Sequence, residues 1–385
     1  MRIAVFSNTY LPSLNGVANV VEAYRKSLVE LGHEVYIFAP GTSAKDDPDD
    51  HEHILRFPSF EAPTFDYSVA MPFSLPIMRV LHGVSFDIVH THHPLWVGVW
   101  GQWFAHWANL PLVTTVHTEY QIYSEMMPLP SGMVEGFLNR RVVKYCNKCD
   151  MVTTPVPSMR EKLQGFNVAT PIELIPNPTD LSFFVGANGM QIRQSLGIDP
   201  DDTVIGYVGR LSPEKNLPFV LRAATMIIAE DPTAHVLIVG GGPALENLRT
   251  AADELGITDR THFTGEVPYD RIPDHQAALD VFLTASLSET QPLAYTEAMA
   301  VGTPIVAVKA PGSSDMIQDG HNGLLVSHEE GPEGMARAVS ALLKDRQMYD
   351  DIRQAGMKWV ERYDIGAATQ KLLKVYERAQ SSFEA

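Results

Sequence analysis

Short apolar runs alternate with amphipathic segments along the whole chain, and this alternation constrains the fold more than any other feature. The first run, 3–7, leads through a loop into a segment whose apolar side chains share one helical face and which ends at Gly32, a residue typical of helix ends. Strands separated by helices form a parallel sheet covered on both faces. The expected strands of the first half span 3–7, 35–39, 87–90, 112–117, 151–154 and 172–175.

The pattern restarts after a proline-containing link at 175–178. Further strands are expected at 203–208, 236–239, 262–264, 281–285, 304–308 and 323–326, with a helix over 244–255 among them. We therefore predict an α/β protein of two Rossmann-like, doubly wound parallel-sheet domains, and the length of 385 residues agrees with two. Ligands bind beyond the carboxyl ends of such strands, so we expect a site in a cleft where the two domains face each other.

Charge and composition exclude several classes of protein. The formal net charge of −17 argues against nucleic acid as a partner, because binding it requires a basic surface. The opening residues do not resemble a signal peptide, and no run of 18 apolar residues occurs, so we expect a cytoplasmic protein. Cys146 and Cys149 have redox or zinc spacing but no second pair, so we interpret them as two unreactive thiols.

Two glutamates separated by seven residues, Glu289 and Glu297, form the most informative motif. Glu289 follows an expected strand, and Pro292 to Ala294 begins a helix whose first amides are free to bind a phosphate. Glu297, one turn into that helix, can accept two hydrogen bonds from a vicinal diol such as a ribose. An isolated pair of this kind would be explained by the helix dipole alone.

A second loop of the same expected sheet carries Arg210 and Lys215. Arginine binds phosphate oxygens through two parallel hydrogen bonds and lysine supplies a compact charge, so the two can neutralise a diphosphate leaving group. Alone, they would be ordinary surface cations. Because both loops follow strands of one parallel sheet, we interpret the cations and the glutamates as one site. We predict no metal ligand.

At these residues the sequence resembles the retaining glycosyltransferases of family 4, which have the GT-B architecture, and the resemblance covers essentially the whole chain. It implies that Glu289 and Glu297 hold the donor sugar and the nucleotide ribose, and that Arg210 and Lys215 hold the pyrophosphate. It also implies domains of 1–178 and 179–365, with a final helix at about 366–385 crossing back to the first. No cofactor is implied beyond the nucleotide-sugar donor.

Other positions follow from the same resemblance. Gly16 approaches the donor phosphates, His117 lies near the reacting sugar, and Val267 stands in a loop whose backbone contacts the base. The remaining donor contacts are implied for Gln291, Pro292, Leu293 and Ala294. Pro292 stands where the family usually has glycine, and proline cannot donate the backbone hydrogen bond expected there.

The motif that begins at Ser288 and the run 117–123 resemble the branch of the family that glycosylates diacylglycerol. The resemblance implies transfer of a hexose, with UDP-glucose as the favoured donor, to diacylglycerol or a related lipid at the inner face of the cell membrane. Transfer from GDP-mannose, transfer to a soluble sugar, a nucleotide-sugar epimerase and a non-catalytic nucleotide-sugar sensor are the alternatives.

Three weaker signals concern the acceptor side. Trp96, Trp100, Trp103 and Trp107 share one helical stripe, which we expect to pack on the sheet. An apolar segment containing Met126, Met127, Leu129, Met133 and Phe137 precedes the basic stripe Arg140, Arg141, Lys144 and Lys148. That combination suits an interfacial membrane anchor, although a solvated helix face explains the same charges. We expect His90, His92 and His93 to line the cleft rather than to bind a metal.

Overall fold

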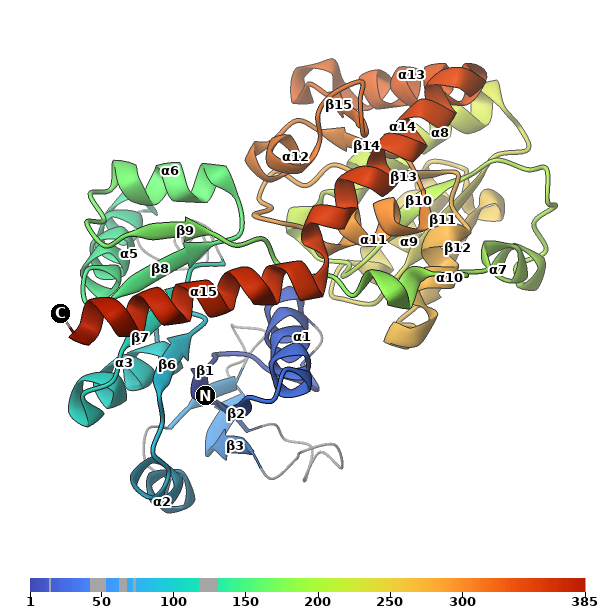
Figure 1. Ribbon diagram of the computed structural model, residues 1–385. Coiled ribbons are helices and arrows are strands. Elements are labelled where there is room, and N and C mark those ends of the chain that lie inside the picture. Colours follow the sequence, from blue (N-terminus) through green and yellow to red (C-terminus); the bar gives the residue numbers. More distant parts are fainter. Residues whose placement is uncertain (14, 42–52, 62–67, 72–73, 118–130, 385) are drawn as a thin grey trace. The chain divides into compact units, whose positions relative to one another are not determined.

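The computed structural model describes residues 1–13, 15–41, 53–61, 68–71, 74–117 and 131–384. The chain divides into unit 1, Met1–Pro178 with Ile365–Ala385, and unit 2, Thr179–Asp364. Each unit is built on a parallel sheet flanked by helices (Figure 1). The predicted α/β class with two doubly wound sheets is confirmed.

Unit 1 contains a seven-stranded sheet in the order β3-β2-β1-β6-β7-β8-β9. Its strands are β1 Arg2–Phe6, β2 Glu34–Pro40, β3 Ile54–Phe57, β6 Ile88–Thr91, β7 Leu112–Thr115, β8 Met151–Thr154 and β9 Ile172–Leu174, and β4 Ser59–Glu61 pairs antiparallel with β5 Ser68–Ala70. Its helices are α1 Gly16–Glu30, α2 Leu75–Gly83, α3 Val97–Ala108, α5 Ser131–Cys146, α6 Pro157–Gly165 and α15 Ile365–Glu384.

Unit 2 contains a six-stranded sheet in the order β12-β11-β10-β13-β14-β15. Its strands are β10 Val204–Val208, β11 His235–Val239, β12 Thr261–Gly265, β13 Val281–Thr284, β14 Ile305–Val308 and β15 Leu324–Val326. Its α-helices are α7 Gly189–Ser195, α8 Leu217–Glu230, α9 Leu245–Glu254, α10 Ile272–Ala277, α11 Leu293–Val301, α12 Pro311–Met316, α13 Gly331–Lys344 and α14 Arg346–Val360. Short 3₁₀ helices are η1 Leu181–Phe184, η2 Pro213–Lys215, η3 Thr258–Arg260, η4 Tyr269–Arg271, η5 His328–Glu330 and η6 Glu361–Tyr363.

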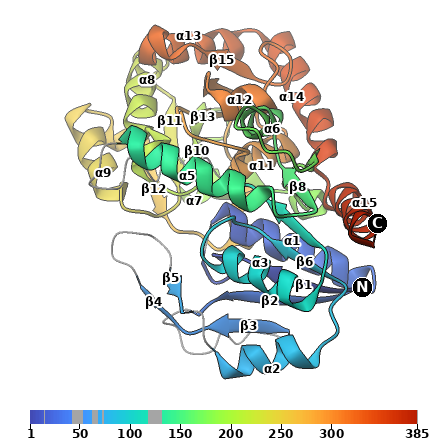
Figure 2. The same ribbon diagram turned by 90° about the vertical axis from the view of Figure 1, so that its left-hand side faces the viewer.

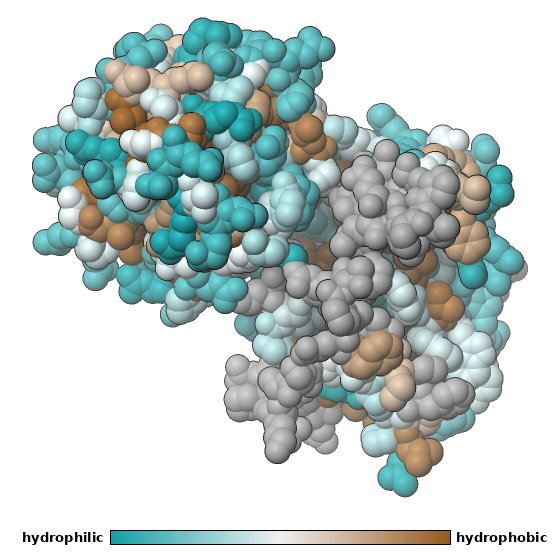
Figure 3. All heavy atoms as spheres, turned by 180° about the vertical axis from the view of Figure 1, so that it is seen from behind, coloured by the Kyte–Doolittle hydropathy of each residue, from teal (hydrophilic) through white to brown (hydrophobic). Residues whose placement is uncertain are grey.

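The central strands are buried along their whole length because helices cover both faces of each sheet. Every residue of β10, β11 and β13 is buried, which is the reason these runs lack the polar alternation of a half-exposed strand. On the face of unit 2 at upper left in Figure 3, hydrophilic side chains are interspersed with apolar ones. All the expected strands are present. The edge strand β3 was not predicted, because Arg56 interrupts its short apolar run.

The expected packing of the tryptophan stripe on the sheet is wrong. Trp103 and Trp107 are about half exposed, and the opposite side of α3 packs instead. The reason is steric: a Cβ at Gly101 would lie 2.8 Å from the Phe6 ring, and one at Gly98 would lie 1.6 Å from the His93 carbonyl oxygen. Small residues therefore bring α3 close to β1 and β6, and the indole rings face away from the core.

The last helix, α15, packs against α1 and β7 within unit 1. Tyr376 is fully buried, and its hydroxyl lies 2.7 Å from Nδ1 of His90 at the end of β6. The other ring nitrogen of His90 lies 2.7 Å from the Thr115 hydroxyl on β7. Tyr376, near the end of the sequence, thus holds the end of β6 in place, and His92 and His93 follow directly from that strand.

Close packing of β10 on β11 requires glycine at position 206. A Cβ there would lie 1.9 Å from the carbonyl oxygen of Leu237 on the neighbouring strand, whose backbone has no room to move. We therefore expect Gly206→Ala to destabilise unit 2 by about 3 kcal/mol and to lower the melting temperature by roughly 6–12 °C.

Gly165→Ala is the matched control, because nothing lies within 4 Å of a Cβ at the end of α6. Its melting temperature should stay within roughly 2 °C of the parent. Differential scanning calorimetry makes the comparison, and equal melting temperatures for the two variants would contradict the packing.

Candidate functional site

The two predicted glutamates lie where β13 passes into α11. Glu289 stands on the connecting loop and Glu297 is the fifth residue of the helix. Pro292 is the N-cap residue, with φ −70° and ψ 119°, and the first helical amides have no partner within the helix. Leu293 and Ala294, which carry two of these amides, are only partly buried, so this helix end is accessible to an anion.

Lys215 and Glu289 form a close ion pair. Nζ of Lys215 lies 2.5 Å from Oε1 of Glu289, and the two side chains are 19% and 16% exposed. Lys215 belongs to the loop after β10 and Glu289 to the loop after β13, and these strands are neighbours in the sheet. The fold therefore brings into contact a predicted cation and a predicted carboxylate that are 74 residues apart in the sequence.

Three glycines hold the surrounding loops close together. A Cβ at Gly312, in α12 after β14, would lie 2.2 Å from the carbonyl oxygen of Glu289. One at Gly242 would lie 2.4 Å from the carbonyl oxygen of Leu211, and the amide of Leu211 donates to Gly241 O at 2.8 Å. Gly242 has φ +140°, a conformation that favours glycine. These contacts fix the loop that carries Arg210 and Lys215. The Arg210 side chain is exposed.

Glu297 is buried, with 8% of its surface exposed. Burial raises the pKa of this carboxyl to about 7, and a hydrogen bond with the Gln276 side chain opposes that shift. Burial of the phenol, and then the nearby Glu297 carboxyl, raises the pKa of Tyr269. The Tyr269 ring stacks on Phe183, with centroids 5.2 Å apart.

Gln276 and Tyr269 were not predicted as site residues, because neither belongs to a recognisable motif. Gln276 is fully buried, and its Oε1 has no hydrogen-bond partner among the described residues. Tyr269 begins η4, two residues after Val267, whose side chain packs against the core of unit 2. The 265–269 loop therefore connects the predicted base-contacting position to the surroundings of Glu297.

In unit 1, His117 follows β7 and is 5% exposed. Its Nε2 lies 2.9 Å from Nδ1 of His92, whereas its own Nδ1 is buried without a partner in the described part of the chain. Burial, and then the neighbouring histidines, holds the pKa of His117 well below its usual range, against a hydrogen bond with Asn177. His117 is therefore neutral at pH 7.

The other residues of unit 1 that were named from the sequence include Gly16, Cys146 and Cys149. Gly16 begins α1, and Oδ1 of the N-cap residue Asn15 accepts a hydrogen bond from the amide of Ala18 at 3.0 Å. Cys146 and Cys149 are buried free thiols. Among the described residues, no three His, Cys, Asp or Glu side chains come together as a metal site would require.

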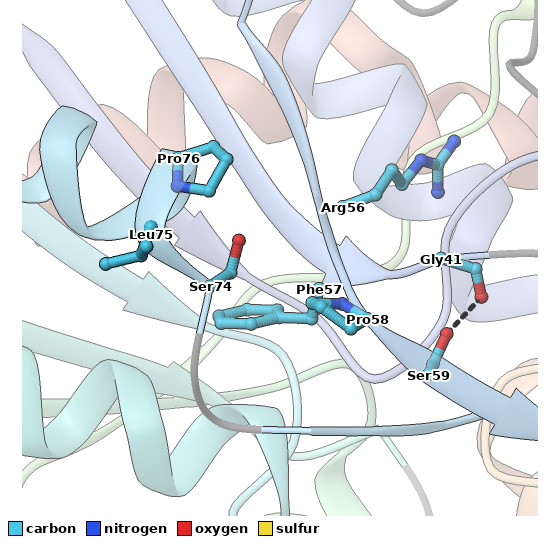
Figure 4. A pocket seen from close by; sticks show the side chains of 8 residues that line it. All are labelled: Gly41, Arg56, Phe57, Pro58, Ser59, Ser74, Leu75 and Pro76. Atoms are coloured by element: carbon cyan, nitrogen blue, oxygen red, sulfur yellow. Dashed lines mark hydrogen bonds between the residues drawn. The ribbon is translucent and has the colours of Figure 1, made fainter.

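Unit 1 also contains an open pocket of about 680 Å³ that was not predicted (Figure 4). It lies beside the ends of β2 and β3 and the start of α2, with Phe57, Pro58, Leu75 and Pro76 as apolar lining. Gly41, Arg56, Ser59 and Ser74 supply polar lining, and the Ser59 hydroxyl donates to Gly41 O at 2.6 Å. The lining suits a ligand with both apolar and hydroxyl groups.

Only part of the predicted interfacial anchor lies within the described residues. Met126, Met127, Leu129 and the run 118–123 lie outside the described residues. Met133, Phe137, Arg140, Arg141 and Lys144 are exposed on α5, and Lys148 is exposed just after this helix ends. None of the described helices combines the length and the apolar character that a bilayer-spanning segment needs.

Comparisons with known proteins identify the family. The model of Glycosyltransferase Family 4 matches residues 14–183, and that of Glycosyl transferases group 1 matches residues 190–359. The alpha-monoglucosyldiacylglycerol synthase of Streptococcus pneumoniae is 30% identical over 342 residues, which cover 87% of this chain and 77% of the relative. The GDP-mannose-dependent alpha-mannosyltransferase of Mycolicibacterium smegmatis is 28% identical over 357 residues, which cover 91% and 90%.

A solved structure extends the agreement to the fold. The crystal structure of Anabaena Alr3699/HepE in complex with UDP and glucose matches 98% of this chain and 99% of its own, with a TM-score of 0.79 at 19% identity. At that identity the likeness concerns the fold, which is GT-B. The chain thus belongs to the family 4 glycosyltransferases and is a hexosyltransferase.

Proposed function

We propose that this protein transfers a hexose, with glucose from UDP-glucose favoured, to the hydroxyl of diacylglycerol or a related membrane lipid, with retention at the anomeric carbon. The observation that carries the proposal is the contact between Lys215 and Glu289 beside the start of α11. At one sheet edge, the cation and the free helix amides can bind the phosphates of an activated sugar, and the carboxylate can bind its hydroxyls.

Arg210, Lys215 and the first amides of α11 bind the diphosphate in this proposal. Because negative charge grows on the diphosphate as the sugar leaves, these groups stabilise the transition state more than the bound donor. Pro292 supplies no amide, so Leu293 and Ala294 supply the amides at this helix end. Glu289, whose Oε1 lies 2.5 Å from Nζ of Lys215, orients the hydroxyls of the donor sugar.

Glu297 binds the ribose in this proposal, and the loop at Val267 contacts the base. A diol that donates two hydrogen bonds to the buried Glu297 carboxylate favours its ionised form. Gln291, buried beside the start of α11, completes the donor contacts. From unit 1 the proposal adds Gly16 for the donor phosphates and His117, a buried neutral imidazole, for the reacting sugar.

The reaction breaks the bond between the anomeric carbon and the diphosphate oxygen and forms a bond from the same carbon to the acceptor oxygen. The acceptor hydroxyl loses its proton to the departing diphosphate, so no additional base is required. Both events occur on one face of the sugar, and the configuration is retained. The pocket beside β3 has room for the glycerol part of a lipid acceptor, with apolar lining for the start of its chains.

The similarity to an alpha-monoglucosyldiacylglycerol synthase supports diacylglycerol as the acceptor and glucose as the transferred sugar. Action at the inner face of the cell membrane is part of the same proposal. A GDP-mannose donor is the second candidate, favoured by the mannosyltransferase relative that matches most of this chain.

Lys215→Ala should lower kcat by about 10²–10³, because one donor to the developing negative charge is lost. Lys344→Ala is the matched control, because Lys344 also pairs with a glutamate, Glu230, but in an exposed position in unit 2. The control should keep full activity, and both variants should melt near the parent temperature. Full activity of Lys215→Ala would exclude the diphosphate role.

Donor binding should depend on pH through Glu297. The pKa of the free carboxyl is about 7, and the diol prefers the ionised form, so affinity should rise from pH 6 to pH 8 and fall as the carboxyl is protonated. Glu297→Gln should bind donor more weakly at pH 8 and lose this pH dependence. Isothermal titration calorimetry makes the measurement, and an unchanged pH dependence in Glu297→Gln would place the ribose elsewhere.

A screen of UDP- and GDP-sugars for nucleotide release, with and without diacylglycerol vesicles, tests the activity itself. Release of UDP from UDP-glucose that requires diacylglycerol, with an α-linked product by NMR, is expected. An epimerase would convert the donor without acceptor, and a sensor would bind donor and release no nucleotide in any mixture.

A further inference from the structure

Two buried histidines follow neighbouring strands of unit 1 and contact each other. His92 comes directly after β6 and is 1% exposed, and His117 comes shortly after β7 and is 5% exposed. Nδ1 of His92 lies 2.9 Å from Nε2 of His117. The proposed function places His117 beside the reacting sugar, and the partner of His117 in this contact is His92.

The geometry of the contact is that of a straight hydrogen bond. The two ring planes differ by 10°, and the ring centroids lie 5.2 Å apart. Because the nearest nitrogens are 2.9 Å apart at this centroid separation, the rings lie edge to edge in nearly one plane. An N–H on one ring then points directly at the nitrogen of the other, which is the alignment that hydrogen bonds prefer. The bond therefore fixes the orientation of the His117 ring as well as its position.

His92 is itself held by neighbouring groups. Its amide donates to Phe6 O on β1 at 2.9 Å, and β1 lies beside β6 (Figure 2). The His90 ring packs against the His92 ring, with centroids 4.3 Å apart. His90 is in turn fixed by the Tyr376 hydroxyl, 2.7 Å from its Nδ1. His92 is therefore a rigid support for His117.

The hydrogen bond between the two rings also sets the tautomer of His117. Burial, and then the neighbouring histidines, holds the pKa of both imidazoles well below the usual range, so both are neutral at pH 7. A neutral imidazole has one N–H and one acceptor nitrogen. If His92 donates, His117 carries its own proton on Nδ1, and if His117 donates, its Nδ1 is an acceptor. The contact thus decides whether Nδ1 of His117 donates to another group or accepts from it.

We propose that His92 is a positioning residue for sugar transfer, because it fixes the ring plane and the tautomer of His117 and thereby the group that His117 presents to the reacting sugar. The inference deepens the proposed function and rests on it, since that function supplies the role of His117. Packing alone would be served by apolar side chains, which need no hydrogen bond when they are buried. A pair of buried polar rings is better explained by what its nitrogens hold in position.

A matched pair of substitutions at position 92 separates the hydrogen bond from the packing. Leucine and asparagine have nearly the same shape, and the asparagine amide places a polar atom where Nδ1 of His92 lies. With UDP-glucose and diacylglycerol in detergent, His92→Leu should lower kcat roughly tenfold to hundredfold and leave the KM for the donor nearly unchanged, because alignment is lost in the transition state. His92→Asn should recover most of the lost kcat. Equal kcat values for the two variants would overturn the proposal.

A double-mutant cycle tests whether His92 acts through His117. His117→Ala alone should lower kcat. Adding His92→Leu to that variant should cause no further loss, because the ring that His92 orients is already gone. A further loss as large as the one that His92→Leu causes in the parent would show independent action and would contradict the positioning role.

His262→Leu is the control for the loss of a histidine pair. Nδ1 of His235 lies 3.0 Å from Nε2 of His262, at the start of β11 and β12 and so at the sheet edge opposite to Lys215 and Glu289. The control breaks a ring-to-ring contact of similar length and should keep the kcat of the parent. A loss of kcat equal to that of His92→Leu would reveal a general effect of lost stability and would refute the proposal.

Nitrogen NMR of the protein with isotope-labelled histidine tests the pairing without using the reaction. The signals of His117 are those that disappear in His117→Ala. They should show one neutral tautomer in the parent and a mixture of the two tautomers in His92→Leu. The same single tautomer in both proteins would mean that His92 does not set it, and the proposal would fail.

The outcome is separable from that of the proposed function. Sugar transfer by the parent together with a fully active His92→Leu would leave that function standing and refute the positioning role. A parent that transfers no sugar would refute the proposed function, and the NMR comparison would then decide whether His92 sets the tautomer of His117.

Discussion

The contact between Lys215 and Glu289 depends on a property of parallel sheets: all strands end at the same edge. β10 and β13 are neighbours, so the loops that follow them meet although they are far apart in the sequence. An ion pair with both side chains mostly buried needs further partners for its remaining hydrogen-bonding groups. A substrate that carries phosphates and hydroxyls provides such partners in the proposed function.

Close packing of the backbone supports this edge. Gly206 lets β10 approach β11, Gly242 lets the next loop lie on Leu211, and Gly312 brings α12 against the backbone of Glu289. In each place a single methyl group would collide with a carbonyl oxygen. The positions of the charged side chains are thus set by contacts between main-chain atoms, which move less than side chains do. Such rigidity suits groups that must be in place before charge develops.

The two sheets could be predicted from the sequence, because a short apolar run is the signature of a buried parallel strand. Each half of the chain contains a series of such runs. The meeting of Lys215 with Glu289 followed from the same rule. What sequence could not provide depends on three-dimensional packing. The direction of the tryptophan stripe was predicted wrongly, since two glycines rather than the large side chains decide which side of α3 packs. The raised pKa of Glu297 results from burial, and the contacts of Gln276 and Tyr269 come from loops without a motif.

The central claim is that unit 2 holds an activated sugar by its diphosphate. A crystal structure of the protein soaked with UDP-glucose tests it most directly. The diphosphate oxygens should lie within hydrogen-bond distance of Arg210 and Lys215, with the ribose on Glu297 and the sugar on Glu289. A nucleotide sugar found bound away from the ends of β10 and β13 would contradict the claim.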